Sequence, residues 1–498
     1  MIENLALGFQ VALSLDTLTF CFIGVSIGMF IGVLPGVGPM AAISMLLPLT
    51  YYISPTDALI MLAGIYYGAQ YGGSVASILL RLPGTASSAV VSLDGYEMTK
   101  NGRAGAALFL SAIASFIGGS IGILLMAGFA PVLSGFALRF GSQEYFLLMA
   151  LGLVAASTLS DGSAVRGLAM VVLGVLLGIV GLDITSGSMR FVYGQFELMD
   201  GVSLVASAMG LFGLSEILSN IGRAERAAPA GRITLRAMMP TARELRDSLP
   251  AIWRGSAIGS FFGTLPGTGS TIASFFSYAA EKRFARNRAR IGKGIVEAVS
   301  GPEAANNSAA QTAFIPTLTL GVPGDAVMAL LLGAMIVHGV TPGPQMLTNT
   351  PEMFWGLVAS FWLGNLILLV FNIPMIGLWV AMLRIPYRLL YPAILVLVVI
   401  GTYSIRYSIF DIYQLLAFGV LGYVLRILAF PAAPLVLGLV LGPLMEENFR
   451  RSLMLSDGSF ITFVTRPISA VLLALIVLVL VAQIASPVLR RRQQPKAP

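Results

Sequence analysis

Hydroxyl side chains cluster beside proline–glycine pairs that interrupt apolar segments of this sequence. The segment 263–270 reads GTLPGTGS, so three hydroxyl-bearing residues flank its proline–glycine pair. A helix cannot pass through such a pair undisturbed, because proline lacks a backbone N–H and glycine favours other conformations. Opened helix ends expose N–H groups that suit an anion and C=O groups that suit a cation. The neighbouring hydroxyls could replace lost hydration around a carboxylate or Na⁺.

The break at 263–270 recurs, which indicates an internal duplication. Residues 32–39 read GVLPGVGP, which is the same pattern. A second break follows each copy, with the sequence LPGT at 82–85 and VPGD at 322–325. Each half of the sequence therefore carries two breaks in the same order, and we expect two structurally related halves.

The breaks and the polar residues beside them form the candidate substrate site. It comprises Pro35, Gly36, Gly38, Arg81, Pro83, Gly84, Thr85, Ser87, Pro266, Gly267, Thr268, Gly269, Ser270, Asn306, Asn307, Pro323 and Gly324. Thr264 and Asp325 are candidate ligands of a coupling ion, a transported Na⁺ is the one metal considered, and no cofactor is expected. For each Ser or Thr the alternative is a hydrogen bond back to its own helix. For each proline–glycine pair the alternative is a structural kink.

Charged residues stand at the second break of each half. Arg81 ends a long apolar run, where a central Arg costs roughly 2.5 to 3.5 kcal/mol. A substrate carboxylate would offset this cost, but Arg81 could equally reach an interface or pair with Asp94. Asp325 could bind a cation or a proton, although an N-cap of the helix that starts at Ala326 is favoured.

Several other residues allow both a functional and a structural interpretation. Glu303, Asn306 and Asn307 could line a path or cap the helix that they open. His338 is the only histidine, and a structural or interface role outweighs a proton relay. Cys21 is the only cysteine, which excludes an intramolecular disulfide and a thiolate metal site, so we expect it to pack as a small apolar side chain.

The composition is that of a polytopic membrane protein. Of the 498 residues, 57% are hydrophobic and only 11% are charged. The mean hydropathy is +0.87, far outside the balance of a soluble domain. The N-terminus lacks a basic region and a small-residue cleavage site, so residues 6–20 are expected to be a retained segment.

Basic residues gather in a few short segments, although the net charge is +7. They lie in the linker 222–250, in 282–293 and in the tail 487–498. Loops rich in Lys and Arg stay in the cytoplasm, so we expect all three segments on the cytoplasmic side of the membrane. The charge thus reflects topology, and no nucleic-acid partner is expected.

The linker divides the sequence into halves, 1–221 and 251–486, which we interpret as two inverted-topology repeats. The apolar segment 251–280 carries a break in its middle and basic residues on both sides. Two half-helices of roughly 14 residues are too short to cross a ~30 Å core, so we expect a re-entrant hairpin. Its counterpart at about 20–49 has no basic flanks, as expected for entry from the opposite face.

Each hairpin precedes a broken helix, at about 58–93 and at about 304–338. Further spans are expected at 104–130, 145–156, 167–182, 202–220, 355–383, 389–403, 413–430, 433–444 and 467–485. The predicted fold class is therefore an all-α polytopic membrane protein with about 10–12 transmembrane helices, the usual framework of secondary transporters.

The motifs, in this order, resemble the large membrane subunit of the bacterial tripartite tricarboxylate transporters, the TctA family. The resemblance is nearly full length and rests on GVLPGVGP at 32–39, PGTASSAVVSLDGY at 83–96, GTLPGTGS at 263–270, GPEAANNSAAQTAFIPTLTLGVPGD at 301–325 and HGVTPGP at 338–344. In this family a neutral residue is common before Leu82, so Arg81 departs from the pattern and citrate itself is not assigned.

The resemblance implies a secondary carrier that imports citrate, other di- and tricarboxylates or related organic acids by cation symport. It implies two partners, a small four-span membrane subunit similar to TctB and a periplasmic substrate-binding protein similar to TctC. It also implies a carboxylate substrate and Na⁺ or H⁺ as the coupling ion. Each negative charge that enters an inside-negative cell costs about 2.3 kcal/mol per 100 mV, so a di- or trianion needs accompanying cations.

Other functions remain as alternatives at this stage. An anion channel or a stand-alone secondary carrier for another small solute would use similar breaks. A membrane enzyme would need an acid–base or metal constellation, against which the single histidine and the few buried carboxylates argue. The sequence lacks the GxxxxGK[ST] loop, so an ion gradient is the natural energy source.

Overall fold

The chain folds almost entirely into helices, which the computed structural model describes for residues 2–34, 38–159, 163–183, 186–220, 238–383 and 387–493. The helices form two units, and each unit draws on both halves of the sequence. Unit 1 comprises Met1–Gly135 and Val205–Tyr423, and unit 2 comprises Phe136–Leu204 and Val424–Pro498. The all-α polytopic fold class is confirmed, whereas the inverted repeats stay a prediction.

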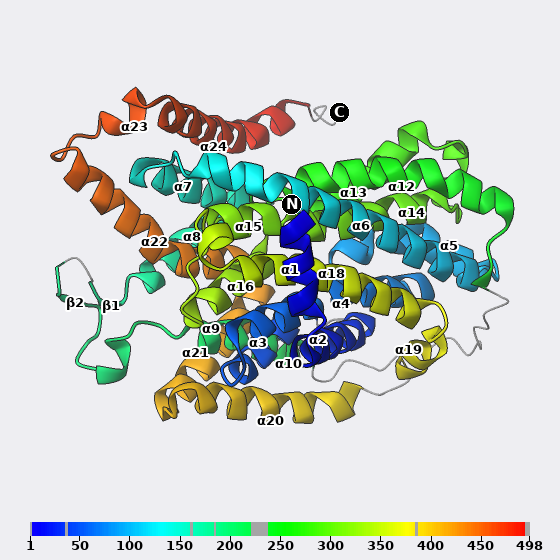
Figure 1. Cartoon of the computed structure of the whole chain (residues 1–498), viewed down its shortest axis with the longest axis horizontal. Helices are drawn as coiled ribbons and strands as arrows, with labels where there is room; N and C mark the ends of the chain where they lie inside the picture. Colours follow the sequence, from blue (N-terminus) through cyan, green and yellow to red (C-terminus); the bar gives the residue numbers. More distant parts are fainter. Residues whose placement is uncertain are drawn as a thin grey trace, which may run out of the picture. The chain divides into compact units, whose positions relative to one another are not determined.

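Unit 1 contains the segments for which the sequence predicts hairpins and broken helices (Figure 1). Its elements are α1 Ile2–Ala12, α2 Leu15–Val33, α3 Gly38–Thr50, α4 Pro55–Leu80, η1 Ser87–Ala89, α5 Ser92–Lys100, α6 Ala104–Ala137, α9 Leu204–Ala208, the π-helical η3 Met209–Leu214, α10 Ser215–Asn220, α12 Ala242–Gly263, α13 Gly269–Phe284, η4 Arg288–Arg290, α14 Glu297–Thr312, α15 Phe314–Leu320, α16 Ala326–Val337, α17 Met346–Asn349, α18 Pro351–Asn372, α19 Ile376–Met382, α20 Tyr387–Arg406 and α21 Ile409–Ile427. The last residues of α6 and α21 belong to unit 2.

Unit 2 contains helices from the middle and the end of the sequence. Its elements are α7 Ser142–Leu159, α8 Ala164–Gly178, β1 Gly181–Leu182, β2 Met189–Arg190, η2 Phe196–Leu198, α22 Ala433–Leu455, α23 Thr462–Thr465 and α24 Pro467–Gln493. The two short strands pair antiparallel, with Gly181 opposite Arg190 and Leu182 opposite Met189.

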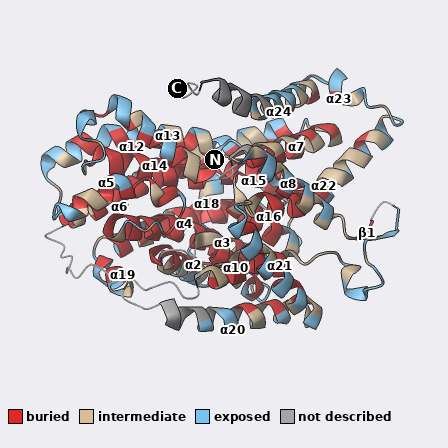
Figure 2. Cartoon of the chain, turned by 180° about the vertical axis from the view of Figure 1, so that it is seen from behind, coloured by how far each residue is buried: buried red, intermediate tan, exposed pale blue. Residues whose placement is uncertain are grey.

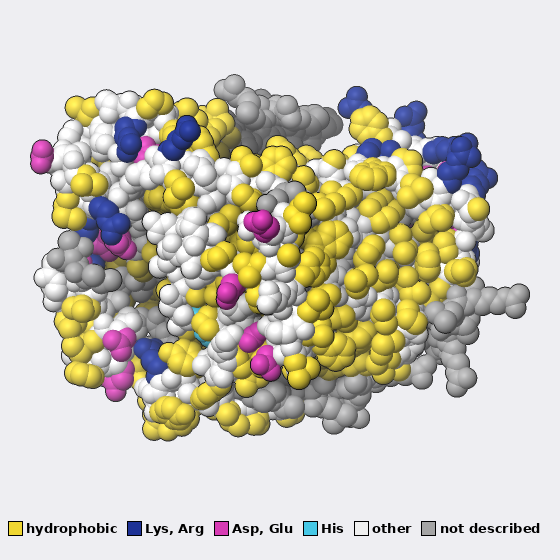
Figure 3. Space-filling model, in the orientation of Figure 1, with side chains coloured by type: hydrophobic (Ala, Val, Ile, Leu, Met, Phe, Trp, Pro, Cys, Tyr) yellow, Lys and Arg dark blue, Asp and Glu magenta, His cyan; other side chains and the backbone are white. Residues whose placement is uncertain are grey.

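Apolar helices dominate the described residues. Four are long and apolar enough to cross a membrane: α2, α6, α18 and α21. Six shorter apolar helices lie at Gly38–Thr50, Ser142–Ser157, Ala164–Gly178, Leu204–Ser219, Ala326–Val337 and Pro467–Gln483. Figure 3 shows a broad hydrophobic surface over unit 1, with Lys and Arg gathered at one edge of it. This surface pattern is that of a multi-pass membrane protein.

The second-half hairpin is made of α12 and α13, joined by the turn at residues 264–268. A capping box begins α12, because the Thr241 hydroxyl accepts from the Glu244 N–H and the Glu244 carboxylate accepts from the Thr241 N–H. Consequently α12 starts inside the predicted linker and has 22 residues. The first-half arm α2 has 19 residues. The arm length of about 14 residues predicted for the second-half hairpin is therefore wrong for α12.

Each hairpin packs tightly on the broken helix that follows it. In the first half, added Cβ atoms on Gly24, Gly28 and Gly32 of α2 would lie 2.2, 2.3 and 2.5 Å from the carbonyl oxygens of Met61, Ile65 and Ala69 of α4. In the second half, Cβ atoms on Gly255, Gly259 and Gly263 of α12 would lie 2.1, 2.2 and 2.5 Å from those of Gly301, Ala305 and Ala309 of α14. Small residues at every fourth position therefore let the backbones touch in both halves.

The breaks also lie in matching places. A Cβ on Gly84 would lie 1.8 Å from the Gly32 carbonyl oxygen, and one on Gly324 would lie 3.4 Å from the Gly263 carbonyl oxygen. The left-handed conformation ends the helix before each break, with Arg81 (φ 58°) after α4 and Gly321 (φ 69°) after α15. Figure 2 shows that α4, α14 and α16 are buried along most of their lengths.

Several predicted spans end at other residues than expected, and three of them show why. The span 167–182 is shorter, because α8 ends at Gly178 and β1 follows. The span 355–383 is interrupted between α18 and α19, at Pro374. The span 433–444 continues to Leu455, because ion pairs one helical turn apart, such as that of Arg451 with Glu447, support the polar end of α22.

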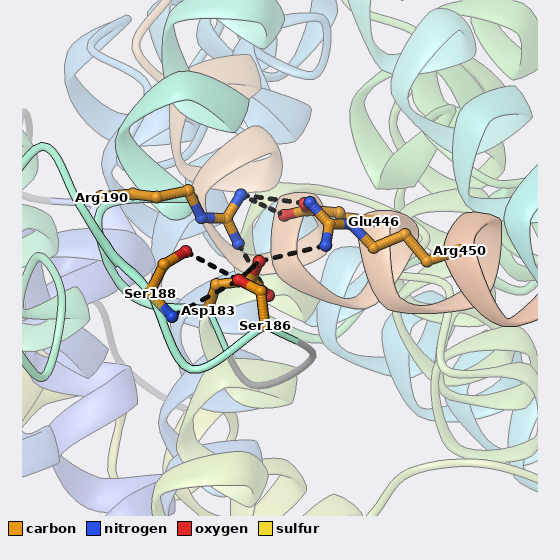
Figure 4. Close-up of polar contacts among 6 residues, drawn as sticks. All are labelled: Asp183, Ser186, Ser188, Arg190, Glu446 and Arg450. Atoms are coloured by element: carbon orange, nitrogen blue, oxygen red, sulfur yellow. Dashed lines mark hydrogen bonds and ion pairs between the residues drawn. The ribbon is translucent and has the colours of Figure 1, made fainter.

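In unit 2, two arginines and two carboxylates hold the strand pair against α22 (Figure 4). Arg190 of β2 forms hydrogen bonds of 2.9 and 3.1 Å to both carboxylate oxygens of Glu446. Arg450 contacts Asp183 at 3.0 Å and Glu446 at 2.8 Å. Ser186 also donates to Asp183. Because each charge has opposite charges beside it, we interpret this cluster as structural.

Candidate functional site

Gln70 of α4 connects the first-half break with the second-half hairpin. Its Oε1 accepts from the Ser87 hydroxyl at 2.7 Å, and its Nε2 donates to Ser270 Oγ, the second residue of α13, at 3.4 Å. The hydroxyl oxygens of Thr85 and Ser87 lie 3.0 Å apart. All four side chains are buried. Three predicted site residues thus meet through Gln70, which the sequence analysis did not single out.

The second break reaches the same part of unit 1 through Asp325. Its Oδ1 accepts from the Met328 N–H at 2.9 Å, which confirms the predicted N-cap of α16. Its Oδ2 accepts from the Tyr66 hydroxyl of α4 at 2.9 Å. A Cβ on Gly269 (φ 60°) would lie 2.9 Å from the Asp325 Cβ. The start of α13, the second break and α4 therefore converge, and a role of Asp325 as an ion ligand stays a prediction.

A fully buried carboxylate of α14, Glu303, contacts α4 one turn after Gln70. Glu303 of α14 accepts from the hydroxyls of Ser74 of α4 at 2.5 Å and Ser115 of α6 at 3.0 Å. Asn307 Nδ2 donates to Ser115 Oγ at 2.8 Å. The capping alternative for Glu303, Asn306 and Asn307 is wrong, because α14 begins at Glu297 and all three residues lie in its interior.

Buried amides beside Glu303 have unused hydrogen-bonding groups. Both polar atoms of Asn306, together with Asn307 Oδ1 and Gln311 Oε1, find no partner in the described part of the chain. All three residues are at most 1% exposed. Native proteins satisfy most buried polar groups, so this set is suited to a ligand. Asn306 lies one turn after Pro302, whose carbonyl accepts from Ser274 of α13 at 3.3 Å, so it lies on the face of α14 toward the hairpin.

Two tyrosines complete the polar lining of α4. The hydroxyls of Tyr67 and Tyr71 donate to Asn365 Oδ1 of α18 at 2.6 and 2.5 Å. Asn365 Nδ2 in turn donates to the Phe116 carbonyl and to Ser120 Oγ of α6, each at 3.0 Å. This network ties α4, α6 and α18 together, and sequence reasoning missed it because each of its residues lies in an uninterrupted apolar run.

Arg81 lies outside this polar region. It is exposed, and its guanidinium carbon is 6.0 Å from the centre of the Tyr96 ring. The suggested pairing with Asp94 is wrong, because the Asp94 carboxylate accepts from the N–H groups of residues 292, 294 and 295 and from Tyr278. Nearby Pro83 is exposed too, while Gly84 is buried. Substrate contact by Arg81 stays a prediction.

Hydroxyls in the hairpin turn bond back to their own hairpin. Thr264 Oγ1 donates to the Phe261 carbonyl at 2.8 Å, and Thr268 Oγ1 donates to the carbonyls of Phe262 and Leu265. Both hydroxyls thus form the hydrogen bonds to their own hairpin that were the alternative to ligand binding. The role of Thr264 as an ion ligand stays a prediction. Pro266 and Gly267 are half-buried in this turn.

The remaining predicted residues occupy varied positions. Pro35 and Gly36 lie outside the described residues, and Gly38 begins α3 with φ 68°. Pro323 is buried in the second break. His338 caps the end of α16, and its Nε2 lies 3.0 Å from Thr50 Oγ1. The buried Cys21 thiol donates to the Ser360 carbonyl. No group of three or more metal-ligating side chains is found among the residues that the structure describes.

Hydroxyls, amides and carboxylates at interrupted helices, inside an apolar helical protein, are the features of a multi-pass membrane transporter. A model of the "Tripartite tricarboxylate transporter TctA family" matches residues 18–437. The chain therefore belongs to the TctA family, whose members are components of tripartite tricarboxylate transporters.

Two uncharacterised proteins of Agrobacterium vitis are similar to this chain. A 52.8 kDa protein of the TAR-I ttuC′ 3′ region is 49% identical over 474 residues, which cover 95% of this chain and 94% of the relative. A protein of the TAR-II ttuC′ 3′ region is 54% identical over 217 residues, which cover 44% of this chain and 90% of the relative. No solved structure matches.

Proposed function

We propose that this chain is the membrane permease subunit of a binding-protein-dependent secondary transporter that imports a di- or tricarboxylate or a related organic anion by cation symport. The observation that carries the proposal is the convergence of both second breaks and the α13 start on α4, through Gln70 and Tyr66. Family membership supports the transport class and the two partner subunits.

The substrate site in this proposal lies between α4, α13 and α14. The backbone N–H groups at the start of α13 and the hydroxyls of Thr85, Ser87 and Ser270 receive the substrate carboxylates. The free amide of Asn306 supplies one further donor from α14. This region holds no buried arginine or lysine among the described residues, so neutral donors bind the anion and coupling cations compensate its charge.

The topology in this proposal places both hairpins in the membrane as re-entrant structures. The basic linker, the loop after α13 and the C-terminus face the cytoplasm of a bacterium, and the chain lies in the inner membrane. A small four-span TctB-like subunit and a periplasmic TctC-like binding protein complete the system, and the binding protein delivers the anion.

Leaving out one component at a time tests this assignment. Proteoliposomes with all three components should take up labelled citrate or another carboxylate from a panel with saturation, and those without the binding protein should not. The matched control is the complete system with a binding protein that is saturated with unlabelled ligand. Uptake that is equally fast and unsaturable without the binding protein would contradict the proposal and identify a channel.

A further inference from the structure

Glu303 is a fully buried carboxylate that the proposed substrate site does not use. Its side chain is 0% exposed, and no ion pair to it is found in the described residues. An unpaired buried carboxylate is expensive as an anion, and such a residue within a membrane segment is usually functional. A proton or a bound cation would neutralise this carboxylate.

The hydrogen bonds on the α6 side of Glu303 have a fixed direction. Ser115 Oγ accepts from Asn307 Nδ2 at 2.8 Å, so its single hydroxyl hydrogen points to Glu303 Oε2 at 3.0 Å. Asn307 Nδ2 also donates to the Glu303 carbonyl at 3.0 Å, which holds this amide in place. Oε2 is therefore an acceptor whether or not the carboxyl carries a proton.

The hydrogen bonds on the α4 side can reverse. Ser74 Oγ lies 2.5 Å from Glu303 Oε1 and 3.4 Å from the Gln70 carbonyl. When Glu303 is ionised, the Ser74 hydroxyl donates to Oε1. When Oε1 carries a proton, the carboxyl donates to Ser74 and the serine hydroxyl turns to the Gln70 carbonyl. Rotation of one hydroxyl thus accommodates both protonation states without a change in the fold.

The groups that face Glu303 leave it electrically isolated. On α4 the titratable side chain that Glu303 influences is Tyr71, whose hydroxyl donates to Asn365 of α18. On α6 no residue is titratable. Glu281 of α13 forms an ion pair with Arg254 of α12 and lies beside Gly301, which is two residues before Glu303 and therefore on the other side of α14. Among the described residues, no Lys, Arg or His forms an ion pair with Glu303.

We infer that Glu303 carries the coupling proton, on Oε1, in exchange with Ser74 of α4. This inference rests on the proposed function, because it assigns the ion of that symport. Gln70 of α4 takes part in both sites. Its backbone carbonyl accepts the reversed hydrogen bond from Ser74, and its side chain contacts Ser87 and Ser270. Protonation of Glu303 and binding at the first break therefore act on one turn of α4.

Infrared difference spectroscopy tests the proton site without a known substrate. The full-length protein in liposomes should show a carboxylic-acid C=O band that is lost as the pH rises, and Glu303→Gln should lack this band. The exposed Glu352→Gln is the matched control and should retain it. Ser115→Ala keeps the carboxyl but removes its fixed donor, so it should shift the band, which identifies Glu303 even if Glu303→Gln fails to fold.

Two results would overturn the inference. One is a Glu303→Gln spectrum that retains the pH-dependent band. The other is loss of the band on addition of NaCl, but not KCl, at constant pH, which would show that the site holds Na⁺.

A transport measurement separates this inference from the proposed function. In the complete reconstituted system, Glu303→Gln should lose accumulation driven by a pH gradient and should keep exchange of internal for external carboxylate. Accumulation by the variant at the wild-type level would contradict the role of Glu303 and leave carboxylate import intact. Absence of both accumulation and exchange in the wild-type system would contradict the proposed function itself, whatever the infrared result.

Discussion

At the scale of single residues, the buried amide of Asn306 separates function from stability. Its Nδ2 and Oδ1 have no partner in the described residues, and a buried unsatisfied polar group costs about 1–3 kcal/mol. A residue that lowers stability in this way is expected to serve a ligand. The structure contains similar amide atoms at Asn307 and Gln311, but each of those side chains has only one unpartnered atom.

We therefore predict opposite effects of Asn306→Leu on stability and uptake. The substitution removes the unsatisfied amide and keeps the branched shape and heavy-atom count of the side chain, so it should raise the free energy of unfolding by about 1 kcal/mol. It should also abolish substrate uptake, because the donor is lost. Thermal unfolding in detergent and uptake in proteoliposomes measure the two effects. A variant that is destabilised, or that transports normally, would show that Asn306 is a packing residue.

Arg81 allows a second prediction at this scale. It adopts the left-handed conformation at φ 58°, where the second half has Gly321 at φ 69°. This conformation costs a residue other than glycine roughly 1–2 kcal/mol, so Arg81→Gly should stabilise the protein by about 1 kcal/mol. Because Arg81 is exposed and points to Tyr96, we expect uptake to persist. A large rise in KM with unchanged stability would instead support the sequence-based prediction that Arg81 binds substrate.

At the scale of elements, the contact between each hairpin and its broken helix explains the spacing of glycines. Added Cβ atoms on Gly28 and Gly259 would lie 2.3 and 2.2 Å from the opposite backbone. Backbone cannot move aside as a side-chain tip can, so the helices must separate. Loss of this contact would also move the first residues of α3 and α13.

We predict that Gly259→Ala and Gly28→Ala destabilise the protein by about 1–3 kcal/mol each, as overpacked substitutions do. Gly128→Ala in α6 is the matched control, because no atom lies within 4 Å of its added Cβ, and it should be neutral or stabilising. Urea or thermal unfolding of the three variants measures the differences. Equal stability of Gly259→Ala and Gly128→Ala would contradict the close packing of α12 on α14.

Local features of the helices could be predicted from the sequence, whereas contacts between distant helices could not. Helix ends at proline–glycine pairs were predictable, because these residues act on the local backbone, and Asp325 was predictable as an N-cap for the same reason. Gln70, Tyr66 and the hydroxyl partners of Glu303 were not, because apart from the Gln70–Ser87 contact their hydrogen bonds join residues about 200 positions apart or more. The arm length of α12 was misjudged because a capping box extends this helix into a stretch that charge alone assigned to a linker.

At the scale of the whole molecule, the inverted repeat predicts which loops lie on each face of the membrane. Ser54 and Arg288 are exposed, and the inverted repeat places them on opposite faces of the membrane. Single cysteines at these positions in a Cys21→Ser background should react with an impermeant thiol reagent from opposite sides of oriented vesicles. Labelling of both from the same side would contradict the inverted repeat, although not membership of the family.

The central claim is that an ion gradient drives import of an organic anion through this chain. It is tested most directly by uptake of a labelled di- or tricarboxylate into proteoliposomes that contain this chain, the small membrane subunit and the binding protein, with and without an imposed H⁺ or Na⁺ gradient. We predict accumulation above the external concentration only with a gradient, and accumulation with H⁺ if Glu303 carries the coupling ion. Equal uptake with and without either gradient would contradict the account.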